Sequence, residues 1–340
     1  MWRRLHISAN SFEDYGYPVR VSVVTYWPKM PEVIDFIIET SERLGLKLHT
    51  HHRLRTRPGI KAHTFLFERD EMPLRGFRPN ATPESRHDER YFPNRYLLGS
   101  VLADELYRRT IHLSVDYAVT FGDLALYGPK LIVTDVDSTL ITTEVIEMIA
   151  AAAGTKDRVR EMTSSAMRGE VDFAQSLKDR VATLQGVPTD VFTRIAEEIT
   201  FTDGALALIN TAHRHGARFG VVSGGFHEVV DILARDAHID YVLANRLEAR
   251  DGVLTGKTLG PIIDADAKAH AMEQWAQELG VTRHEAVTVG DGANDLKMLD
   301  RAGLGVGFCG KDIVMKEAPA ILRMQRLDAI AALVGWDIAR

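Results

Sequence analysis

The chain contains 340 residues, of which 45% are hydrophobic and 26% are charged, and its formal net charge is -6. This is the composition of an ordinary globular protein with about two domains, and it excludes a strongly basic chain whose main partner is nucleic acid. The single cysteine, Cys309, excludes an internal disulfide framework, and no run approaches the roughly 18 apolar residues of a membrane span. Because no apolar stretch follows the basic pair Arg3-Arg4, we expect no secretory signal, a cytoplasmic protein and no membrane partner.

Charge is distributed unequally along the chain. Residues 1–128 contain 18 Lys and Arg against 16 Asp and Glu, whereas the remaining residues contain 23 against 31. This difference predicts two units of different character. We place the first at residues 1–126 and the second at residues 127–340.

The first unit is predicted to mix strands and helices. After an irregular lead-in at 1–17, its patterns predict strands at 19–26, 46–55, 61–69 and within 115–126, helices at 31–44 and 96–109, and a long Pro-rich loop at 72–93. This order resembles the small α+β ferredoxin-like modules, including ACT-type amino-acid-binding domains. The histidines and arginines of 49–57 are expected to lie on an exposed strand face rather than to bind metal or nucleic acid.

The second unit repeats a strand followed by a helix, which predicts an α/β fold with a doubly wound parallel sheet. The predicted strands are 131–133, 217–222, 241–244, 286–289 and 304–308, and the predicted helices are 205–215, 226–237, 265–279 and 327–334. Four short helices, at 143–153, 156–168, 173–185 and 189–200, are expected to form a cap inserted at about 143–202. A hairpin around Asp251-Gly252 is expected to turn Leu247 and Val253 inward.

Two carboxylates stand at the end of the first strand of this sheet. Asp135 and Asp137 follow the apolar run 131–133, and ligands bind at the carboxyl ends of parallel strands. Two like charges at this spacing need a cation or a shared proton. The simpler interpretation is that the segment is only a turn and a helix cap, since Asp, Ser and Thr are favoured in both.

Three further polar clusters follow later elements and favour a catalytic site. They are Ser223-Gly224-Gly225, Lys268 near the start of a predicted helix, and Asp291 with Asn294 and Asp295. Carboxylates can hold a hard divalent cation, whereas the serine, the glycine amides and the lysine can bind a phosphate group. Metal and lysine together would allow an aspartate to attack an anionic phosphoryl group.

In order and spacing, these clusters resemble the four motifs of the haloacid dehalogenase-like phosphatase superfamily over about residues 130–335. The resemblance implies that Asp135 is a nucleophile that forms an aspartyl-phosphate and that Asp137 is the general acid and then the general base. It also implies catalytic roles for Ser223 and Lys268. Val136 departs from the pattern, because aromatic residues or Met are common at this position in the family.

The same resemblance implies a magnesium site and contacts with the phosphate. Mg²⁺ would be held by Asp135, the carbonyl of Asp137 and Asp291, with support from Asp295 and Asn294. Ser223, Gly224 and Asn294 would contact the substrate.

The predicted cap indicates the class of substrate. Glu144 and the segment 166–181 resemble the branch of the superfamily that acts on O-phosphoserine. Glu144 would pair with the substrate ammonium and Arg180 would bind its carboxylate, while Met167 and Phe173 would exclude water above the phosphate. The simpler interpretations are a first-turn helix acid for Glu144, an exposed helix residue for Arg180, and core packing for Met167 and Phe173.

We therefore expect a phosphoric monoester hydrolase that converts O-phospho-L-serine to L-serine and phosphate, the last step of serine biosynthesis. Two alternatives remain open. One is a phosphatase or phosphotransferase for another small phosphorylated amino acid such as phosphohomoserine, and the other is an amino-acid-sensing scaffold, which four charges in one pocket argue against. The sequence leaves the oligomeric state open, a homodimer included.

Overall fold

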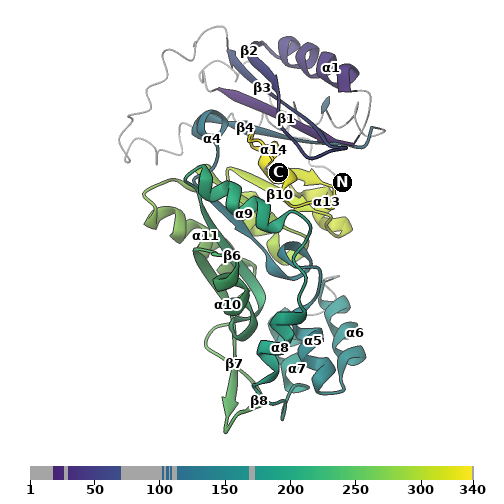
Figure 1. The fold of residues 1–340 in the computed structure, drawn as a ribbon, viewed down its shortest axis with the longest axis vertical. Helices are drawn as coiled ribbons and strands as arrows, with labels where there is room; N and C mark the ends of the chain where they lie inside the picture. Colours follow the sequence, from purple (N-terminus) through teal and green to yellow (C-terminus); the bar gives the residue numbers. More distant parts are fainter. Residues whose placement is uncertain are drawn as a thin grey trace.

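The computed structural model describes residues 18–26, 30–69, 113–167 and 173–338, together with Leu102, Glu105, Leu106 and Arg108. Figure 1 shows a small unit stacked on a larger one along the long axis of the molecule. The expected lead-in at 1–17, the loop at 72–93 and most of the helix at 96–109 lie outside the described residues. No helix among the described residues has the length and apolar character needed to span a membrane.

The small unit contains a four-stranded antiparallel sheet with the strand order β2-β3-β1-β4. Its elements are β1 (Val19–Thr25), α1 (Met30–Arg43), β2 (Leu46–Arg53), β3 (Lys61–Arg69) and β4 (Val115–Phe121). This order is that of a ferredoxin-like sheet, so the topology that the sequence predicts is confirmed.

The two faces of this sheet have different neighbours because side chains alternate along each strand. Val21 of β1 lies opposite Phe65 of β3, and both pack with Ile37 of α1. On the other face, Val24 and Ala62 belong to the hydrophobic core of the larger unit. Helix α1 therefore covers the outer face of the small sheet, and the larger unit covers its inner face.

The larger unit contains a seven-stranded sheet with the order β11-β10-β9-β5-β6-β7-β8, in which only the β7–β8 pair is antiparallel. Its strands are β5 (Leu131–Thr134), β6 (Arg218–Phe226), β7 (Tyr241–Arg250), β8 (Val253–Leu259), β9 (Ala286–Gly290), β10 (Leu304–Phe308) and β11 (Ala320–Leu322). Its helices outside the cap are α4 (Gly122–Tyr127), α9 (Ala205–Arg214), α10 (His227–Asp236), α11 (Ala265–Glu278), α12 (Leu296–Arg301), α13 (Asp312–Glu317) and α14 (Ala329–Leu333), with short helical turns at Val136–Leu140, Arg283–Glu285 and Ala293–Asp295. The α/β fold with a mostly parallel sheet is confirmed.

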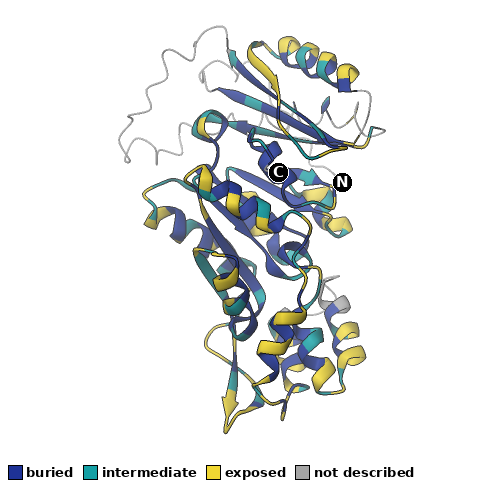
Figure 2. Cartoon of the chain, viewed as in Figure 1, coloured by how far each residue is buried: buried dark blue, intermediate teal, exposed yellow. Residues whose placement is uncertain are grey.

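The central strands of this sheet are buried on both faces (Figure 2). In β5, Ile132 packs into the cluster that includes residues of α9 and α10, whereas Leu131 and Val133 pack with Met272 and Trp275 of α11. Two helical layers therefore enclose the sheet, which explains why its strands appear in the sequence as uninterrupted apolar runs.

Four helices form the cap, which is inserted between β5 and β6. They are α5 (Val145–Ala152), α6 (Lys156–Met167), α7 (Phe173–Ala182) and α8 (Val191–Glu198). The two chain segments that connect the cap to the sheet pair with each other, because Ile141 bridges Phe201 and the amide of Thr202 donates to the carbonyl of Leu140 over 2.9 Å. These connections hold the cap at the carboxyl edge of the sheet, below the core in Figure 1.

Several sequence expectations are corrected by the structure. Val253 is 39% exposed, and its neighbour Leu254 is buried instead, because the hairpin pairs Val253 with Arg250 at its solvent end. The last strand of the small unit ends at Phe121 and the chain continues as α4. The sequence patterns also missed α12, α13 and β11, which are only three to six residues long.

The histidines of 49–57 are exposed as expected, but two of the arginines do not share their strand. Arg55 and Arg57 follow β2, where they form ion pairs with Asp337 and Asp328 of the larger unit. The two arginines therefore form ion pairs between the small unit and the larger unit.

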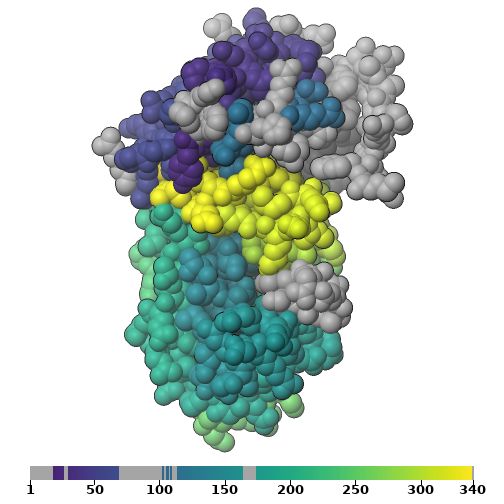
Figure 3. Space-filling model, turned by 90° about the vertical axis from the view of Figure 1, so that its right-hand side faces the viewer, coloured from purple at the N-terminus to yellow at the C-terminus, as the bar shows by residue number. Residues whose placement is uncertain are grey.

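A buried carboxylate of β4 connects the small sheet to the edge of the large one. Asp116, which is 6% exposed, accepts hydrogen bonds from the amides of Arg323 and Met324, at 2.8 and 3.0 Å, and from the Arg323 guanidinium at 3.0 Å. Arg323 and Met324 directly follow β11, the edge strand of the large sheet. Figure 3 shows the C-terminal residues, in yellow, as a band between the small unit and the cap.

Replacing Asp116 with alanine is expected to lower the free energy of unfolding in urea by about 2–4 kcal/mol, because the substitution leaves two backbone amides and one guanidinium without their acceptor. Asp35→Ala, at an exposed position of α1, is the matched control and should change stability by less than about 0.5 kcal/mol. An equal loss in both variants would show that Asp116 does not hold the units together.

Candidate active site

Three adjacent strands bring the polar motifs to one edge of the sheet. Thr134, the last residue of β5, lies opposite Val221 of β6 on one side and Val289 of β9 on the other. Because the three strands are parallel, the residues that follow these positions emerge together. The structure thus brings Asp135, Ser223 and Asp291 to one site, as the sequence predicts.

Lys268 reaches this site from α11. The carboxylate of Asp264 caps the helix by accepting the amides of Asp266 and Ala267, and Lys268 lies one turn further on. Its side chain is fully buried, and its Nζ donates to Oδ1 of Asp135 and to Oδ1 of Asp295, both at 2.7 Å. Burial alone lowers the pKa of Lys268, but the two carboxylates outweigh it and raise the pKa above its ordinary value.

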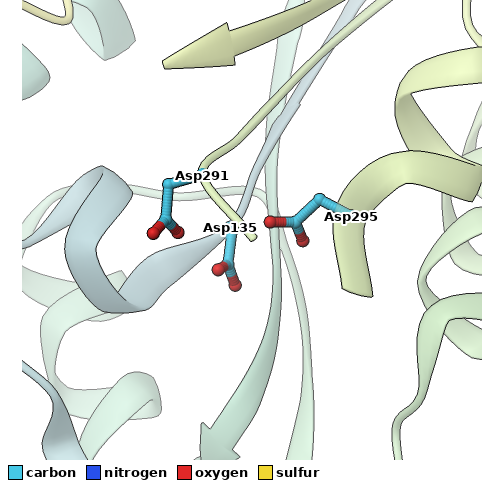
Figure 4. A group of neighbouring side chains, drawn as sticks. All are labelled: Asp135, Asp291 and Asp295. Carbon is cyan, nitrogen blue, oxygen red and sulfur yellow. The ribbon is translucent and has the colours of Figure 1, made fainter. Parts of the chain in front are cut away.

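Asp135, Asp291 and Asp295 form a buried acidic cluster. One carboxylate oxygen from each residue lies within 4.8 Å of the others, and Figure 4 shows Asp135 between the other two. Burial, followed by the charge of Asp295, raises the pKa of Asp135 well above its usual range and that of Asp291 to about 6. The cluster therefore carries more negative charge than Lys268 offsets, and its oxygen donors suit a hard divalent cation.

The three acids of this cluster are not equally available to a cation. Oδ1 of Asp295 accepts from Lys268, and its Oδ2 accepts from the Gly292 amide at 3.0 Å. Asp295 therefore supports the others. Lys268 binds only Oδ1 of Asp135, and the contacts of Asp291 are longer, with Thr139 Oγ1 at 3.4 Å from its Oδ1 and Lys311 Nζ at 3.5 Å from its Oδ2, so these two acids are more available to a metal. The side chain of Asp137 does not belong to this cluster of described acids.

Asp137 is held between the sheet and the cap. Its Oδ1 accepts the amide of Val145, the first residue of α5, at 2.7 Å, and its Oδ2 lies 3.4 Å from the Ser223 hydroxyl. Burial and the nearby charge of Glu144 raise the pKa of Asp137 to about 7. A carboxyl group with this pKa can both give and take a proton near neutral pH.

The turn after Asp137 has an unusual backbone. Ser138 adopts φ 58°, in the left-handed region that few residues other than glycine occupy, and its hydroxyl donates to Oε1 of Glu144 at 3.0 Å. Such conformations are found preferentially at functional sites. Here the turn directs Asp137 and Glu144 toward the same volume.

The loop after Val222 in β6 has the features of a phosphate-binding segment. The Gly225 amide donates to the Ser223 hydroxyl at 2.8 Å, and a Cβ added at Gly225 would lie 2.8 Å from Oδ2 of Asp137. Glycine is therefore required for this close approach of the backbone to Asp137. Ser223 is fully buried, whereas Gly224 is partly exposed.

Asn245 of β7 fixes this loop, and the sequence analysis missed it. Its Nδ2 donates to the carbonyl of Gly224 at 2.9 Å, and its Oδ1 accepts the amide of Ile263 at 2.9 Å. Ile263 immediately precedes Asp264, the N-terminal capping residue of α11. Asn245 therefore joins the serine loop to the helix that carries Lys268. The available signal was an asparagine, which strands disfavour, directly after the apolar run 241–244.

Lys311 is a second residue that the sequence analysis missed. Its Nζ lies 3.5 Å from Oδ2 of Asp291, and its amide donates to the carbonyl of Asp291. Nothing in the local pattern around Lys311 indicated this contact, because it depends on how the chain returns after β10. Asn294 is partly exposed beside Gly292, where a Cβ would lie 2.3 Å from its Oδ1.

The cap contributes Arg180, which is buried, with 6% of its surface exposed. Its Nε donates to the carbonyl of Ser176 at 3.2 Å, and its Nη1 donates to Oγ1 of Thr163 at 3.1 Å. Burial lowers the pKa of Arg180, while the charges of Glu144 and Asp137 act in the opposite direction. The expectation of an exposed helix residue at Arg180 is therefore wrong.

Glu144 also faces the site. It precedes α5, and burial raises its pKa against the opposing effect of its Ser138 hydrogen bond. Met167 ends α6 and Phe173 begins α7, but their side chains lie outside the described part of the structure, so the water-excluding role remains an expectation.

This fold and this arrangement of acids, lysine and serine define a phosphoryl-transfer hydrolase. A family model for haloacid dehalogenase-like hydrolases matches residues 132–300. The chain belongs to this family.

Among its relatives are enzymes named phosphoserine phosphatase. The Lactococcus lactis phosphoserine phosphatase is 52% identical over 184 residues, which cover 54% of this chain and 85% of that protein. The Mycobacterium tuberculosis phosphoserine phosphatase SerB2 is 48% identical over 221 residues, which cover 65% of this chain but only 54% of that protein. A crystal structure of a probable phosphoserine phosphatase from Vibrio cholerae matches 93% of this chain and 86% of its own, with a TM-score of 0.65 and 29% identity.

Replacing Asn245 with alanine is expected to lower the free energy of unfolding by about 2–4 kcal/mol, because the Gly224 carbonyl and the Ile263 amide each lose a buried partner. Urea unfolding checks this, with Asn210→Ala on the exposed face of α9 as the control. The control should be neutral or slightly stabilising, since alanine favours helices. An unchanged free energy of unfolding in Asn245→Ala would contradict the proposed role of Asn245 in fixing the serine loop.

Proposed function

We propose that this chain is a phosphoserine phosphatase that hydrolyses O-phospho-L-serine to L-serine and phosphate, the last step of serine biosynthesis. The observation that carries the proposal is the nearness of the buried Arg180 and of Glu144 to Asp137, whose Oδ1 also accepts the amide of Val145 at the start of the cap. A phosphorylated amino acid has an ammonium, a carboxylate and a phosphate, and this site offers an oppositely charged side chain for each: Glu144, Arg180 and Lys268. The relatives that carry this name, at 48–52% identity, support the same substrate.

We further propose that Mg²⁺ binds to the carboxylates of Asp135 and Asp291 and to the carbonyl of Asp137. The support is chemical, because crowded and buried carboxylates beside a phosphate site require a hard cation. When bound, this ion would offset the negative charge of the phosphate as the carboxylate approaches it.

In the proposed reaction, Asp135 attacks phosphorus and the bond between phosphorus and the serine oxygen breaks. Lys268 holds Oδ1 of Asp135, which leaves Oδ2 to act as the nucleophile. Asp137 gives its proton to the departing serine oxygen. It then takes a proton from the water that hydrolyses the aspartyl-phosphate, so the enzyme returns to its initial state.

The remaining residues would bind the substrate. The Ser223 hydroxyl and the Gly224 amide would donate to phosphate oxygens, with Asn294 beside them. Glu144 would pair with the ammonium and Arg180 would bind the carboxylate in a bidentate manner. Met167 and Phe173 would exclude water from above the phosphate.

The organisation of the chain follows as part of the proposal. We assign residues 1–126 to the small unit, residues 127–340 to the phosphatase unit and about 143–202 to the cap. The single cysteine supports a reducing compartment, for which we propose the cytoplasm, and a homodimer is the proposed assembly.

Removal of divalent cations is expected to abolish phosphate release from L-phosphoserine, and Mg²⁺ should restore it. Mg²⁺ alone should also raise the midpoint of thermal unfolding, because a ligand at 100 times its Kd stabilises the native state by about 2.7 kcal/mol. Asp291→Asn should remove most of this stabilisation, whereas the exposed Asp300→Asn should keep it. A thermal shift that persists in Asp291→Asn would exclude the proposed metal site.

Substitution of Arg180 with alanine is expected to separate amino-acid recognition from the phosphoryl chemistry. The ratio kcat/KM for L-phosphoserine should fall by about 100-fold, because the substrate loses charge-assisted hydrogen bonds, while p-nitrophenyl phosphate should be hydrolysed as before. Arg194→Ala, an exposed arginine of α8, is the control in the same cap. Equal losses for both substrates would contradict the assignment of Arg180, and no turnover of phosphoserine by the wild-type protein would contradict the proposed function.

A further inference from the structure

The guanidinium of Arg180 has one connection within its own helix and one outside it. The bond from Nε goes to the carbonyl of Ser176, one turn earlier in α7. The bond from Nη1 goes to Thr163 in α6, 17 residues away in the chain. Within the described part of the chain, Thr163 is thus the one hydrogen-bond acceptor that ties this side chain to another element of the cap.

Thr163 is suited to act as a fixed support. Its side chain is buried, with 3% of the residue exposed, and α6 packs against both α5 and α7. Threonine has few rotamers because its β-carbon is branched, so a buried hydroxyl on a packed helix has little freedom. The position of Oγ1 is therefore set by the cap rather than by Arg180.

The guanidinium lacks a direct counterion in the part of the chain that the structure describes. No carboxylate there lies within 4.0 Å of its nitrogens, although the group is buried. Burying a cation is unfavourable unless an anion pairs with it. Two bonds fix the plane of the guanidinium, and three of its five N–H groups remain for both oxygens of an incoming carboxylate.

We propose that Thr163 is a positioning residue that determines selectivity for amino-acid phosphates by orienting Arg180 toward the substrate carboxylate. The inference rests on the proposed function, because it assigns a supporting residue to the same substrate site. Among the described residues, the hydroxyl of Thr163 bonds to Arg180, whereas the hydrogen bonds of Asp135 and Asp137 go to other groups. Its loss should consequently change the recognition of the amino-acid part and leave the phosphoryl chemistry intact.

The test compares Thr163→Val, which has nearly the same shape but no hydroxyl, with Thr163→Ser, which keeps the hydroxyl. In Thr163→Val, KM for L-phosphoserine should rise by about 10-fold or more, with kcat changed less than about twofold, as expected for the loss of one charge-assisted hydrogen bond. Values for p-nitrophenyl phosphate should stay as in the wild type. Thr163→Ser should restore the wild-type KM.

A matched control separates this role from a merely structural one. Thr211 of α9 is also buried and also accepts a hydrogen bond from an arginine, Nη2 of Arg214, at 2.9 Å. It lies near the beginning of β6, at the opposite edge of the sheet from the site. Thr211→Val should lower the unfolding midpoint about as much as Thr163→Val does, without changing either KM.

A second measurement places the effect on Arg180. In an Arg180→Ala background, adding Thr163→Val should change kcat/KM for phosphoserine by less than about twofold, because the arginine that Thr163 orients is gone.

If Thr163→Val fails to fold, Thr163→Ala replaces it in both measurements with the same expectations. An equal rise in KM for both substrates, an unchanged KM for phosphoserine, or a full additive effect in the Arg180→Ala background would overturn the inference. In each of these cases the wild-type enzyme still hydrolyses phosphoserine, so the proposed function stands. A wild type that hydrolyses only the aryl phosphate would overturn both.

Discussion

The buried ammonium of Lys268 is the interaction on which the rest of the site depends. It lies between Asp135 and Asp295 at 2.7 Å from each, in a place where either carboxylate alone would be strongly disfavoured. The lysine allows two acids to approach each other, but burial and the charge of Asp295 still raise the pKa of Asp291, against the opposing effect of Lys311. The charges of the site therefore favour the binding of one more cation, and this cation would in turn favour an anionic substrate. A carboxylate can attack an anionic phosphate only when such positive charges, first the lysine and then the metal ion, offset the repulsion between them.

The sheet supplies the geometry that this charge arrangement needs. Strand β5 in the centre, with β6 and β9 on either side, sets Asp135 beside Ser223 and Asp291 by register alone. Asn245 then ties the serine loop to the start of α11, so that the lysine and the loop keep a constant separation. The cap approaches from the other side, and the bond from Thr163 extends the same rigidity to Arg180.

Much of this could be predicted from the sequence, and the physical reason is the same for each success. The apolar run 131–133 and the acids directly after it are local signals, and the parallel topology then determines where they meet. Features that depend on tertiary contacts were missed or misjudged. Asn245, Thr163 and Lys311 have no local signature for their partners, which lie 17 to 21 residues away. The side of the hairpin that Val253 faces was misjudged because Val253 pairs with Arg250, and side chains alternate along β7, so this pair lies on the face opposite to Leu247 and Leu254.

The account makes Asp135 the residue that becomes covalently phosphorylated, and trapping that intermediate tests it most directly. The enzyme is mixed with phosphoserine and quenched with borohydride, which reduces an acyl phosphate to the alcohol, and the residue is identified by peptide mass spectrometry. The account predicts homoserine at position 135 and an unmodified residue at position 137. Reduction at position 137, or none at position 135 while phosphoserine is being turned over, would contradict it.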